Sequence, residues 1–494
     1  MFETVEIGQH MSKAEFESVR PQLQVALLAA QRSLRDSQVP VIIIISGVEG
    51  AGKGHVVSRL HEWLDVRNLE TVTFWDESDE ERERPRYWRF WRTLPARGTI
   101  GMLFGSWYTK PIIDRVNRDI SSSEFDRELH RIAEFERLLS NDGALIIKLW
   151  FHIAKEVQQE RLKEDKKKRP GGTSSYLKMF AKLYDRFRTV SERAIRLTDQ
   201  GESPWHIIEA TDDRYRDITT GITVLNAMQE KLDALRAPTP PSEGTAIETT
   251  YPGEPDPLTV LDRVDLTQKL EDTEYRKELE RAQNRVFRAG WNMRNARRNC
   301  VLVFEGWDAA GKGGAIRRVT QALDARLYRT IPIAAPTDEE RAHHYLWRFW
   351  RHIPRAGRMT LYDRSWYGRV LVERVENFAR LDEWQRAYKE INDFEEQLTE
   401  HGIVLLKFWL HIDQAEQERR FRERETIAYK QHKITADDWR NRSRWRDYEI
   451  AVNEMVARTS TNFAPWTLVP ANDKKFARVK ILTTVADALE QALD

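Results

Sequence analysis

Short apolar runs alternate with longer amphipathic stretches along the chain. Six runs have the length and the continuous hydrophobicity of strands that are buried on both faces: 41–46, 145–151, 205–208, 300–304, 404–410 and 466–469. Between the runs, apolar residues recur with helical spacing, as in 11–35 and 315–323. Strands that alternate with helices predict an α/β fold whose parallel sheet is covered on both faces. Ligands of such folds bind at the carboxyl ends of the strands.

The second half of the chain repeats the first. Gly47 precedes Gly306 by 259 positions, and the same offset relates pairs of tryptophan, histidine, lysine and proline in the two halves. The pentapeptide Trp-Arg-Phe-Trp-Arg occurs unchanged at 88–92 and at 347–351. Because tryptophan and histidine are rare residue types, chance does not supply so many matches in one register. The sequence therefore predicts a tandem duplication of one domain.

A proline-rich segment separates the two repeats. Residues 237–257 hold six of the eighteen prolines and almost no apolar residues, which is typical of a linker rather than of a packed core. We therefore expect an N-terminal domain over 1–236, this linker, and a C-terminal domain over 258–494. Both domains are at the large end of the usual range for single domains.

The composition narrows the class of protein. The chain has 494 residues, of which 40% are hydrophobic and 32% charged, and it has no apolar run of membrane-spanning length. Its N-terminus lacks the basic-then-apolar pattern of a signal peptide, and one cysteine, Cys300, cannot form an internal disulfide. We therefore expect a cytoplasmic protein. Because the formal net charge is only +1, any attraction for polyanions must come from local clusters of charge.

A glycine-rich loop follows a predicted strand in each repeat. In the second repeat, Gly306, Gly311 and Lys312 fit the pattern G-x-x-x-x-G-K and a predicted helix follows; the first repeat has this pattern at 47–54. In such loops, backbone N–H groups surround phosphate oxygens and the lysine adds a positive charge. An ordinary glycine-rich turn is the alternative, but the register of glycines and lysine favours phosphate binding.

The loop of the second repeat departs from the common pattern at one position. Where Ser or Thr normally supplies a hydroxyl to Mg²⁺, this chain has Gly313, followed by Gly314. Both are candidate phosphate-binding positions, together with the two earlier glycines. Asp308, inside the loop, is the obvious replacement ligand because Mg²⁺ prefers oxygen donors such as carboxylates.

An acidic residue and two arginines follow a short apolar stretch of the second repeat. Asp363 stands where a strand would end, which is the usual place of a second Mg²⁺ anchor beside a phosphate loop. We therefore predict that Asp308 and Asp363 are metal ligands. Arg364 and Arg369 are candidates for neutralising the charge of a transferring phosphoryl group. A surface ion pair between Asp363 and Arg364 is the alternative.

Cationic residues are concentrated between positions 341 and 369, where Asp363 is the only acid. They are Arg341, His343, His344, Arg348, Arg351, His352, Arg355, Arg358, Arg364 and Arg369. We expect this cationic strip to bind a long anion, with Arg348 and Arg351 among the phosphate-binding residues. The alternatives are a solvated helix face, packing of arginine on tryptophan, and single-stranded nucleic acid. The last is disfavoured because no nucleic-acid-binding module is recognisable.

The segment 429–448 has aromatic residues at helical spacing but too many charges for a buried helix. We expect a lid that closes on the substrate and excludes water. Its candidate cationic residues are Lys430, Lys433, Arg440 and Arg444. A plain solvated helix is the alternative.

The first repeat has lost parts of this chemistry. The residue that matches Asp308 is Glu49, and those that match Asp363 and Arg364 are Phe104 and Gly105. Neither phenylalanine nor glycine can bind a metal or a developing negative charge. We therefore expect the first repeat to be catalytically silent.

Several segments of the second repeat resemble the polyphosphate kinase 2 family. They are 306–314 (Gly-Trp-Asp-Ala-Ala-Gly-Lys-Gly-Gly), 362–369 (Tyr-Asp-Arg-Ser-Trp-Tyr-Gly-Arg), 439–455 and 465–473. The resemblance covers nearly all of residues 258–494, and the first repeat matches as a degenerate copy. It implies a P-loop kinase-like, three-layer αβα domain with a parallel sheet and a helical lid, present twice.

The resemblance also implies an activity. Two-domain members of this family transfer a phosphoryl group from inorganic polyphosphate to AMP. By this likeness, Asp308 and Asp363 are linked to Mg²⁺, Lys312, Arg364 and Arg369 bind phosphate, the cationic strip lines a polyphosphate channel, and 429–455 forms the lid. The residues that hold the base are not readable, so GMP stays a second candidate acceptor.

Three other functions stay open at this point. A relative that phosphorylates nucleoside diphosphates such as ADP or GDP would carry the same loop. An ATP-dependent mononucleotide kinase would also need such a loop, although Gly313 and the cationic strip count against it. A non-catalytic polyanion-binding scaffold would explain the strip and the repeat, but not the pairing of two acids with the loop lysine. We expect neither a nucleic-acid nor a membrane partner, and the duplication leaves a homo-oligomer open.

Overall fold

The chain folds into two compact units. The computed structural model describes residues 1–168, 182–237, 258–427 and 436–493, to which all structural statements here refer. Of these residues, unit 1 draws on those within 1–77, 89–237 and 338–344, and unit 2 on those within 78–88, 258–337 and 345–493. The expected division at a 237–257 linker stays a prediction, because almost all of that segment lies outside the described residues.

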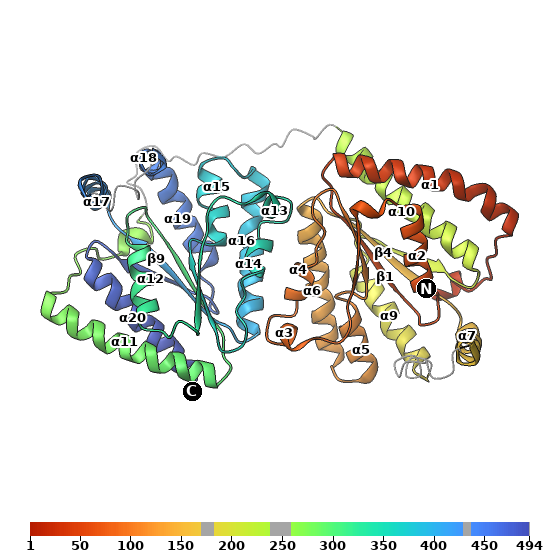
Figure 1. The fold of residues 1–494 in the computed structure, drawn as a ribbon, viewed down its shortest axis with the longest axis horizontal. Coiled ribbons are helices and arrows are strands. Elements are labelled where there is room, and N and C mark those ends of the chain that lie inside the picture. The colour runs from red at the N-terminus through yellow and green to blue at the C-terminus, as the bar shows by residue number, and fades with distance from the viewer. Residues whose placement is uncertain (169–181, 238–257, 428–435, 494) are drawn as a thin grey trace. The chain divides into compact units, whose positions relative to one another are not determined.

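Unit 1 contains a five-stranded parallel sheet in the order β2-β3-β1-β4-β5, of which β1 and β4 are labelled in Figure 1. Its strands are β1 (Val41–Gly47), β2 (Leu69–Thr73), β3 (Ile100–Phe104), β4 (Leu145–His152) and β5 (Trp205–Glu209). The helices of the first repeat are η1 (Phe2–Val5), α1 (Lys13–Asp36), α2 (Lys53–Trp63), η2 (Val66–Asn68), α3 (Asp79–Arg82), α4 (Trp88–Trp91), α5 (Thr109–Asn117), α6 (Ser122–Asn141), α7 (Lys155–Lys168), α9 (Tyr184–Thr198) and α10 (Asp213–Arg236).

Unit 2 has the same architecture, with a parallel sheet in the order β10-β9-β6-β8-β7. Its strands are β6 (Cys300–Gly306), β7 (Tyr328–Pro332), β8 (Met359–Asp363), β9 (Val404–His411) and β10 (Trp466–Pro470). The helices of the second repeat are η3 (Leu261–Arg263), α11 (Asp272–Asn295), α12 (Lys312–Gln321), α13 (Asp338–Arg341), α14 (Trp347–Trp350), η4 (Trp366–Arg369), α15 (Val372–Val375), α16 (Leu381–Glu400), α17 (Gln414–Thr426), α18 (Ala436–Ser443), α19 (Trp445–Thr459) and α20 (Lys474–Gln491).

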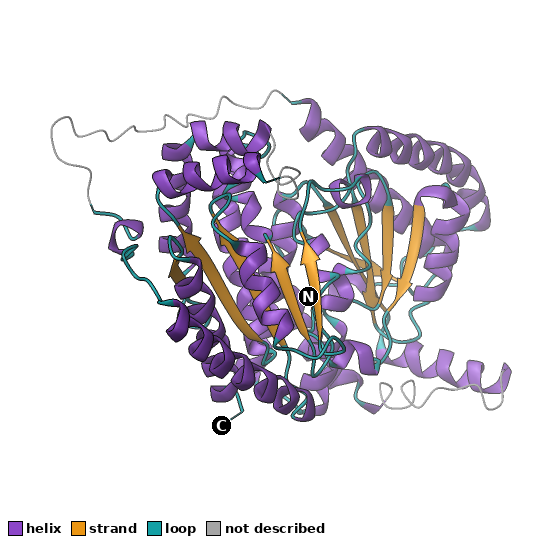
Figure 2. Ribbon diagram, turned by 60° about the vertical axis from the view of Figure 1, so that its left-hand side comes forward, coloured by secondary structure: helices purple, strands orange, loops and turns teal. Residues whose placement is uncertain are grey.

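The predicted α/β fold with a parallel sheet in each copy is confirmed. In each unit, helices lie on both faces of the sheet, as Figure 2 shows, and the central strands β1 and β6 are buried along almost their whole length. Because water is excluded from both faces, these strands are continuous apolar runs. Two short segments are exchanged between the repeats, since α3 counts with unit 2 and α13 with unit 1.

The same buried ion pair stabilises both units. In unit 2, Lys407 on β9 donates to Glu395 on α16 at 2.6 Å and to the carbonyl oxygen of Thr459 at 2.7 Å, and both charged side chains are fully buried. In unit 1, Lys148 and Glu136 form the equivalent pair at 2.8 Å, also without exposure. Such a pair is tolerated only when further hydrogen bonds satisfy it, so it fixes how one helix packs on the sheet in each repeat.

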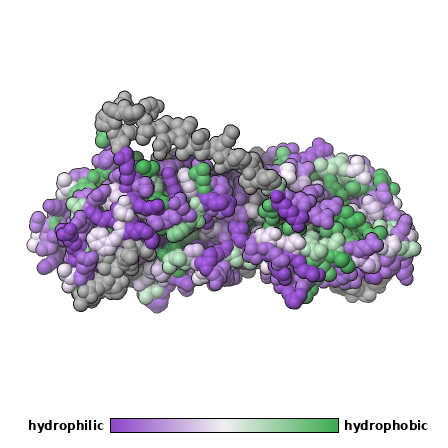
Figure 3. Space-filling model, turned by 90° about the horizontal axis from the view of Figure 1, so that it is seen from above, coloured by the Kyte–Doolittle hydropathy of each residue, from purple (hydrophilic) through white to green (hydrophobic). Residues whose placement is uncertain are grey.

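The surface is mainly hydrophilic, as expected for a chain with 32% charged residues. Hydrophilic residues prevail on the face shown in Figure 3, and hydrophobic residues form patches between them. Among the described residues, no helix combines the length and the apolar character that a membrane crossing needs.

Candidate active site

The glycine loop of unit 2 connects β6 to α12 at the carboxyl end of the sheet. Gly306 has a φ of 150°, and a Cβ atom there would lie 2.5 Å from the carbonyl oxygen of Leu410, so only glycine fits. Gly311, with a φ of 111°, caps α12. The helix begins at Lys312, three residues before the predicted start. Its first-turn N–H groups therefore point out of the loop and can bind an anion.

Lys312 folds back over the loop. Its Nζ atom donates to the carbonyl oxygens of Gly306 at 2.5 Å and Trp307 at 3.2 Å. Among the described residues, it hydrogen-bonds to carbonyl oxygens only. Burial lowers the pKa of Lys312, and the nearby Asp308 opposes this shift. The ammonium group is thus incompletely compensated, which favours the binding of an anion.

The sheet brings the two predicted acidic residues to the same edge. Asp363, the last residue of β8, pairs in register with Phe304, two residues before the loop begins. Asp308 lies in the loop itself, and both carboxylates act on the pKa of Lys312 and of Arg364. Asp308 and Lys312 thus line the same cavity, and Asp363 stands at the end of the strand next to β6.

Both carboxylate oxygens of Asp308 have partners. Oδ1 accepts a bond of 3.0 Å from Arg364, and Oδ2 accepts one of 3.0 Å from Asn441. Only 15% of the side chain is exposed. Burial alone would raise the pKa of Asp308, but Lys312 and Arg364 hold it below its usual value. The carboxylate is therefore ionised at neutral pH and ready to act as a ligand.

The donor set fits a Mg²⁺ ion held in part by the substrate. No group of three metal-binding side chains occurs in the described part of the chain. Mg²⁺, however, is commonly bound through one or two carboxylates, water and substrate phosphates. Asp363 is partly exposed and accepts no side-chain hydrogen bond within the described residues, while Asp308 would exchange one of its two partners. Asp308 and Asp363 would therefore be enough protein ligands for a Mg²⁺ ion that also binds water and substrate phosphates.

Arg364 has a strained backbone. Its φ is 65°, a left-handed conformation that non-glycine residues rarely adopt. The matching residue of the first repeat is Gly105, with a φ of 82°. Strain of this kind persists at functional sites, where the side chain is needed. Here the guanidinium is half exposed and binds Asp308.

Glu305 belongs to this cluster and was missed by sequence reasoning. Its buried carboxylate accepts a 2.8 Å hydrogen bond from Ser365 Oγ, and burial raises its pKa although Lys312 opposes the shift. The signal was a single acid at the end of an otherwise apolar strand. In the first repeat the matching residue is Ser46.

Helix α17 braces the loop from behind, which the sequence analysis also missed. Arg420 is buried and donates to the carbonyl oxygens of Ala309 and Ala310 at 3.0 and 2.9 Å. Gln417 donates to the carbonyl oxygen of Asp308 at 3.1 Å. Both residues recur at the repeat offset of 259, and this could have indicated a shared role. Arg161 and Gln158 of the first repeat donate to its loop in the same way.

Helices α18 and α19 of the predicted lid lie against the loop. Asn441 binds Asp308, and the ring of Trp445 stacks on Trp307 with centroids 3.7 Å apart. Two of the predicted lid cations do not face the loop: Arg440 pairs with Glu376 at 3.1 Å and Arg444 with the same carboxylate at 3.6 Å. The other two, Lys430 and Lys433, lie outside the described residues.

The remaining predicted phosphate ligands, Arg369, Arg351 and Arg348, have partners within the protein. Arg369 pairs with Glu373 at 3.2 Å and lies over the ring of Tyr345. Arg351 lies over the ring of Trp347, and Arg348 donates to a backbone carbonyl oxygen. Arginine on aromatic rings was one of the alternatives considered for the cationic strip.

The cationic strip is also divided by the sheet. Arg358 directly precedes β8 and Arg364 directly follows it, so they lie at opposite ends of one strand. Residues that are close together in the sequence thus lie at opposite ends of the parallel strands. Arg348, although it precedes β8 in the sequence, donates to the carbonyl oxygen of Ala334, just past the carboxyl end of β7.

The cavity at the loop is small. It has a volume of about 70 Å³ and is lined by the loop, by Arg364 and by residues of the predicted lid such as Trp445 and Tyr448. A ligand of nucleotide size needs a cleft of roughly 300 Å³ or more. Part of the wall must therefore move before such a ligand can enter.

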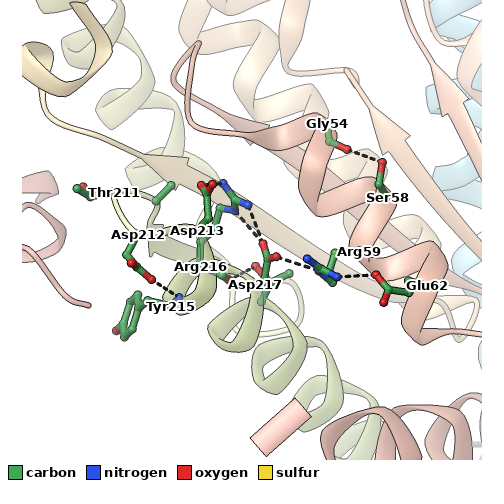
Figure 4. Close-up of polar contacts among 12 residues, drawn as sticks. Gly54, Ser58, Arg59, Glu62, Thr211, Asp212, Asp213, Tyr215, Arg216 and Asp217 are labelled. Carbon is green, nitrogen blue, oxygen red and sulfur yellow. Dashed lines mark hydrogen bonds and ion pairs between the residues drawn. The ribbon is translucent and has the colours of Figure 1, made fainter. Parts of the chain in front are cut away.

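The loop of unit 1 has the same backbone but different partners. Lys53 donates to Glu49 at 3.1 Å as well as to two carbonyl oxygens. The buried Arg216 packs against Gly52, where a Cβ atom would meet its Nη1 at 2.1 Å. Figure 4 shows Arg216 between Asp213 and Asp217, with bonds of 2.6 and 2.8 Å. The positive charges around this loop are neutralised within the unit.

Comparison with known proteins gives one consistent result. The family model described as Polyphosphate kinase 2 (PPK2) matches residues 10–235 and again 269–494. The chain is 48% identical to Polyphosphate:AMP phosphotransferase of Pseudomonas aeruginosa, over 100% of this chain and 99% of that protein. It is 39% identical to ADP-polyphosphate phosphotransferase 3 of Rhizobium meliloti, over 44% of this chain and 76% of that protein.

A solved structure agrees with these matches. The crystal structure described as polyphosphate kinase 2 from Pseudomonas aeruginosa superimposes with a TM-score of 0.88 at 47% identity. The match covers 100% of this chain and 99% of that one. The duplicated fold is therefore shared over the whole length.

Proposed function

The chain belongs to the polyphosphate kinase 2 family, and we propose that it transfers the terminal phosphoryl group of inorganic polyphosphate to AMP, giving ADP. The observation that carries this proposal is the cluster of Asp308, Asp363, Arg364 and Lys312 at the glycine loop of unit 2. The matching residues of unit 1 do not form such a cluster. We therefore assign the reaction to unit 2.

The choice of AMP as acceptor is supported by how much of this chain each group of relatives matches. Proteins named polyphosphate:AMP phosphotransferases match both repeats. Relatives named ADP- or GDP-polyphosphate phosphotransferases match 37–45% of this chain, which is about one repeat. The duplicated architecture thus favours AMP, and a nucleoside diphosphate is the second candidate acceptor.

The reaction needs no covalent enzyme intermediate. An oxygen of the AMP phosphate attacks the terminal phosphorus of polyphosphate, the bridging P–O bond breaks, and the remaining chain leaves one unit shorter. The attacking oxygen is already deprotonated at neutral pH, so no general base is required. Catalysis then depends on positioning and on electrostatic stabilisation.

The loop residues have distinct roles in this proposal. The first turn of α12 and Lys312 bind the transferring phosphoryl group, and Arg364 neutralises the charge that develops on its oxygens. Asp308 and Asp363 hold the Mg²⁺ ion. When bound, this ion supplies Lewis-acid stabilisation of donor and acceptor oxygens.

The lid controls access. Asn441 and Trp445 close the cavity over the loop, and at about 70 Å³ it is too small for substrates. Movement of α18 and α19 would admit the nucleotide and would release one oxygen of Asp308 from Asn441. Reclosure would exclude water, which competes with AMP as acceptor.

The proposal is tested by incubating the purified protein with Mg²⁺, polyphosphate and either AMP or ADP, followed by chromatography of the nucleotides. We expect ADP from AMP, and an Asp363→Asn variant should be slower by about 10²-fold or more, as for the loss of one transition-state contact. Removal of the metal with EDTA should stop the reaction. ATP formed from ADP without any turnover of AMP would favour the second candidate.

A matched control exists in the first repeat. Phe104 occupies the position of Asp363 there, so Phe104→Leu should leave the rate of transfer unchanged. Undiminished transfer in Asp363→Asn would refute the metal assignment while leaving the activity itself established.

A further inference from the structure

Unit 2 has a second cavity, of about 680 Å³, that is separate from the glycine loop. Four arginines and two carboxylates are prominent in its wall: Arg82, Arg297, Arg298, Arg355, Asp79 and Glu83. All of these residues belong to unit 2. Formally, the wall therefore has an excess of two positive charges.

The cavity lies at the amino ends of the parallel strands, opposite to the candidate active site at their carboxyl ends. Arg297 and Arg298 precede β6, and Arg355 precedes β8, whereas the glycine loop and Asp363 stand at the carboxyl ends of these strands. At about 3.3 Å per residue, the strands separate the two sites by roughly 20 Å. A ligand in this cavity therefore does not touch the reacting atoms.

Two of the arginines in this wall, Arg297 and Arg355, share one carboxylate. Glu83, of which 13% is exposed, accepts from Arg297 at 2.6 Å and from Arg355 at 2.7 Å. One negative charge thus faces two guanidinium groups. The hydrogen bond from Arg355, followed by that from Arg297, holds the pKa of Glu83 below its usual value, so this carboxylate is charged.

Arg298 adds a further positive charge. Within the described part of the chain, its guanidinium forms no hydrogen bond or ion pair. It lies over Gly402, where a Cβ atom would be 3.9 Å from its Cζ atom, and Gly402 has a φ of 85°. The glycine leaves the guanidinium open toward the cavity.

The fold itself does not require this charge. In the first repeat, the residues that match Arg297, Arg298 and Arg355 are Gln38, Val39 and Ala96. The two units nevertheless share the same sheet order. The cationic wall is therefore a property of unit 2 alone and calls for a separate explanation.

We propose that this cavity binds the phosphoanhydride chain of a polyphosphate or of a nucleotide, as a second site apart from the one that transfers phosphate. Guanidinium groups form paired hydrogen bonds with phosphate oxygens, and they are suited to a chain of phosphates. The cavity volume is within the range of small-molecule sites. The proposal does not depend on the activity assigned to the glycine loop.

The test uses the full chain in the Lys312→Ala background, in which phosphate binding at the glycine loop is weakened. Inorganic triphosphate is titrated calorimetrically without Mg²⁺, which prevents turnover. We expect Arg298→Glu to weaken the remaining binding at least about tenfold, the effect of losing one charge-assisted contact. Arg281→Glu is the matched control: it makes the same charge change on α11, outside the cavity, at a residue that is 73% exposed.

Three outcomes decide the matter. Equal triphosphate binding with and without Arg298→Glu overturns the proposal. Competition between ATP and triphosphate for one site supports it, because the shared phosphate chain is then what is recognised. Binding of ATP without binding of triphosphate overturns it, since the nucleoside would be the recognised part.

Two controls make a negative result interpretable. Arg298→Gln, which removes the charge without reversing it, replaces Arg298→Glu if the latter lowers the melting temperature. Arg298→Glu in the otherwise unchanged chain should phosphorylate AMP at the normal rate with saturating polyphosphate. A loss of that rate together with unchanged triphosphate binding would place Arg298 in the catalytic path and refute the second site.

Discussion

In unit 1 the loop lysine, Lys53, donates to the carboxylate of Glu49, whereas in unit 2 Lys312 donates to backbone carbonyl oxygens and Asp308 turns to Arg364. The two loops share the pattern G-x-x-x-x-G-K and the contacts from the following helix, made by Gln158 and Arg161 in unit 1 and by Gln417 and Arg420 in unit 2. The two loops differ at the acid itself, which is Asp308 in unit 2 and the longer Glu49 in unit 1, and at a neighbouring position, which is Arg364 in unit 2 and Gly105 in unit 1.

This comparison assigns a second role to Arg364. Asp308 binds Arg364 and Asn441 and, among the described residues, forms no ion pair with Lys312, so the ammonium group stays available for phosphate. Where the arginine is absent, as in unit 1, the acid and the lysine neutralise each other. Phosphate would then have to break an ion pair before it could bind.

The largest expected effect comes from removing each loop lysine. Lys312→Ala should slow phosphoryl transfer about a thousandfold or more, because a charge that contacts the transferring group is lost. Lys53→Ala should leave the rate unchanged. Initial rates with polyphosphate and AMP, together with circular dichroism as a check of folding, measure the contrast. Comparable losses in the two variants would show that unit 1 is not silent.

The buried ion pairs should respond alike in the two units. Lys407→Met and Lys148→Met each leave a buried glutamate without its charged partner, which costs about 3–5 kcal/mol of the free energy of unfolding. Hydrogen exchange read by mass spectrometry reports each unit separately. If only one of the two variants loses stability, the buried ion pair does not contribute equally to the two units, although their folds are the same.

Acidification should affect unit 2 through His411. Burial lowers the pKa of His411 to about 4, and its Nδ1 accepts a 3.0 Å bond from Trp307. Since the folded-state pKa lies below that of the unfolded chain, about 6.5, the unfolded state binds more protons. Stability is therefore full above pH 6.5 and falls by up to about 3 kcal/mol as the pH approaches 4.

The variant His411→Asn isolates this contribution. An asparagine oxygen can accept from Trp307 but does not titrate. Between pH 6.5 and 4, the melting temperature of the variant should fall less steeply than that of the unchanged chain. Parallel curves would exclude His411 as the source of the acid sensitivity.

The smallest expected change in stability comes from Arg364→Gly. Relief of the left-handed backbone gains roughly 1–2 kcal/mol, and loss of a half-exposed ion pair costs about 1 kcal/mol or less. The free energy of unfolding should therefore hardly change, although transfer is strongly slowed. A large loss of stability in chemical denaturation would contradict the view that the arginine is held under strain for its chemistry.

The long buried strands β1, β4, β6 and β9 and the edge strands β5 and β10 could be predicted from the sequence, whereas β2, β3 and β7 could not. Central strands such as β6 are continuous apolar runs. The edge strands β2 and β7 are short, half exposed and partly polar, so they have neither strict alternation nor a continuous run. The start of α12 was also predicted too late, because its second and third residues, Gly313 and Gly314, have low helix propensity.

The core of the candidate site was predictable because it follows from strand ends. The glycine loop, Asp308 and Asp363 were each visible as a residue type at a strand terminus. Asn441 and Arg420 were not, because they reach the loop from helices more than a hundred positions away. The placement of the cationic strip could not be predicted either, since β8 puts Arg358 and Arg364 at opposite ends of one strand; its binding of a long anion stays a prediction.

The exchanged segments have a practical consequence for dissecting the protein. Unit 2 includes residues 78–88, which the chain makes long before the rest of that unit. A gene that starts at residue 258 would encode the whole second repeat and yet leave unit 2 without one of its parts. Assays of isolated halves would then report the loss of that part, so mutations in the full-length chain are the sounder way to divide the labour between the two repeats.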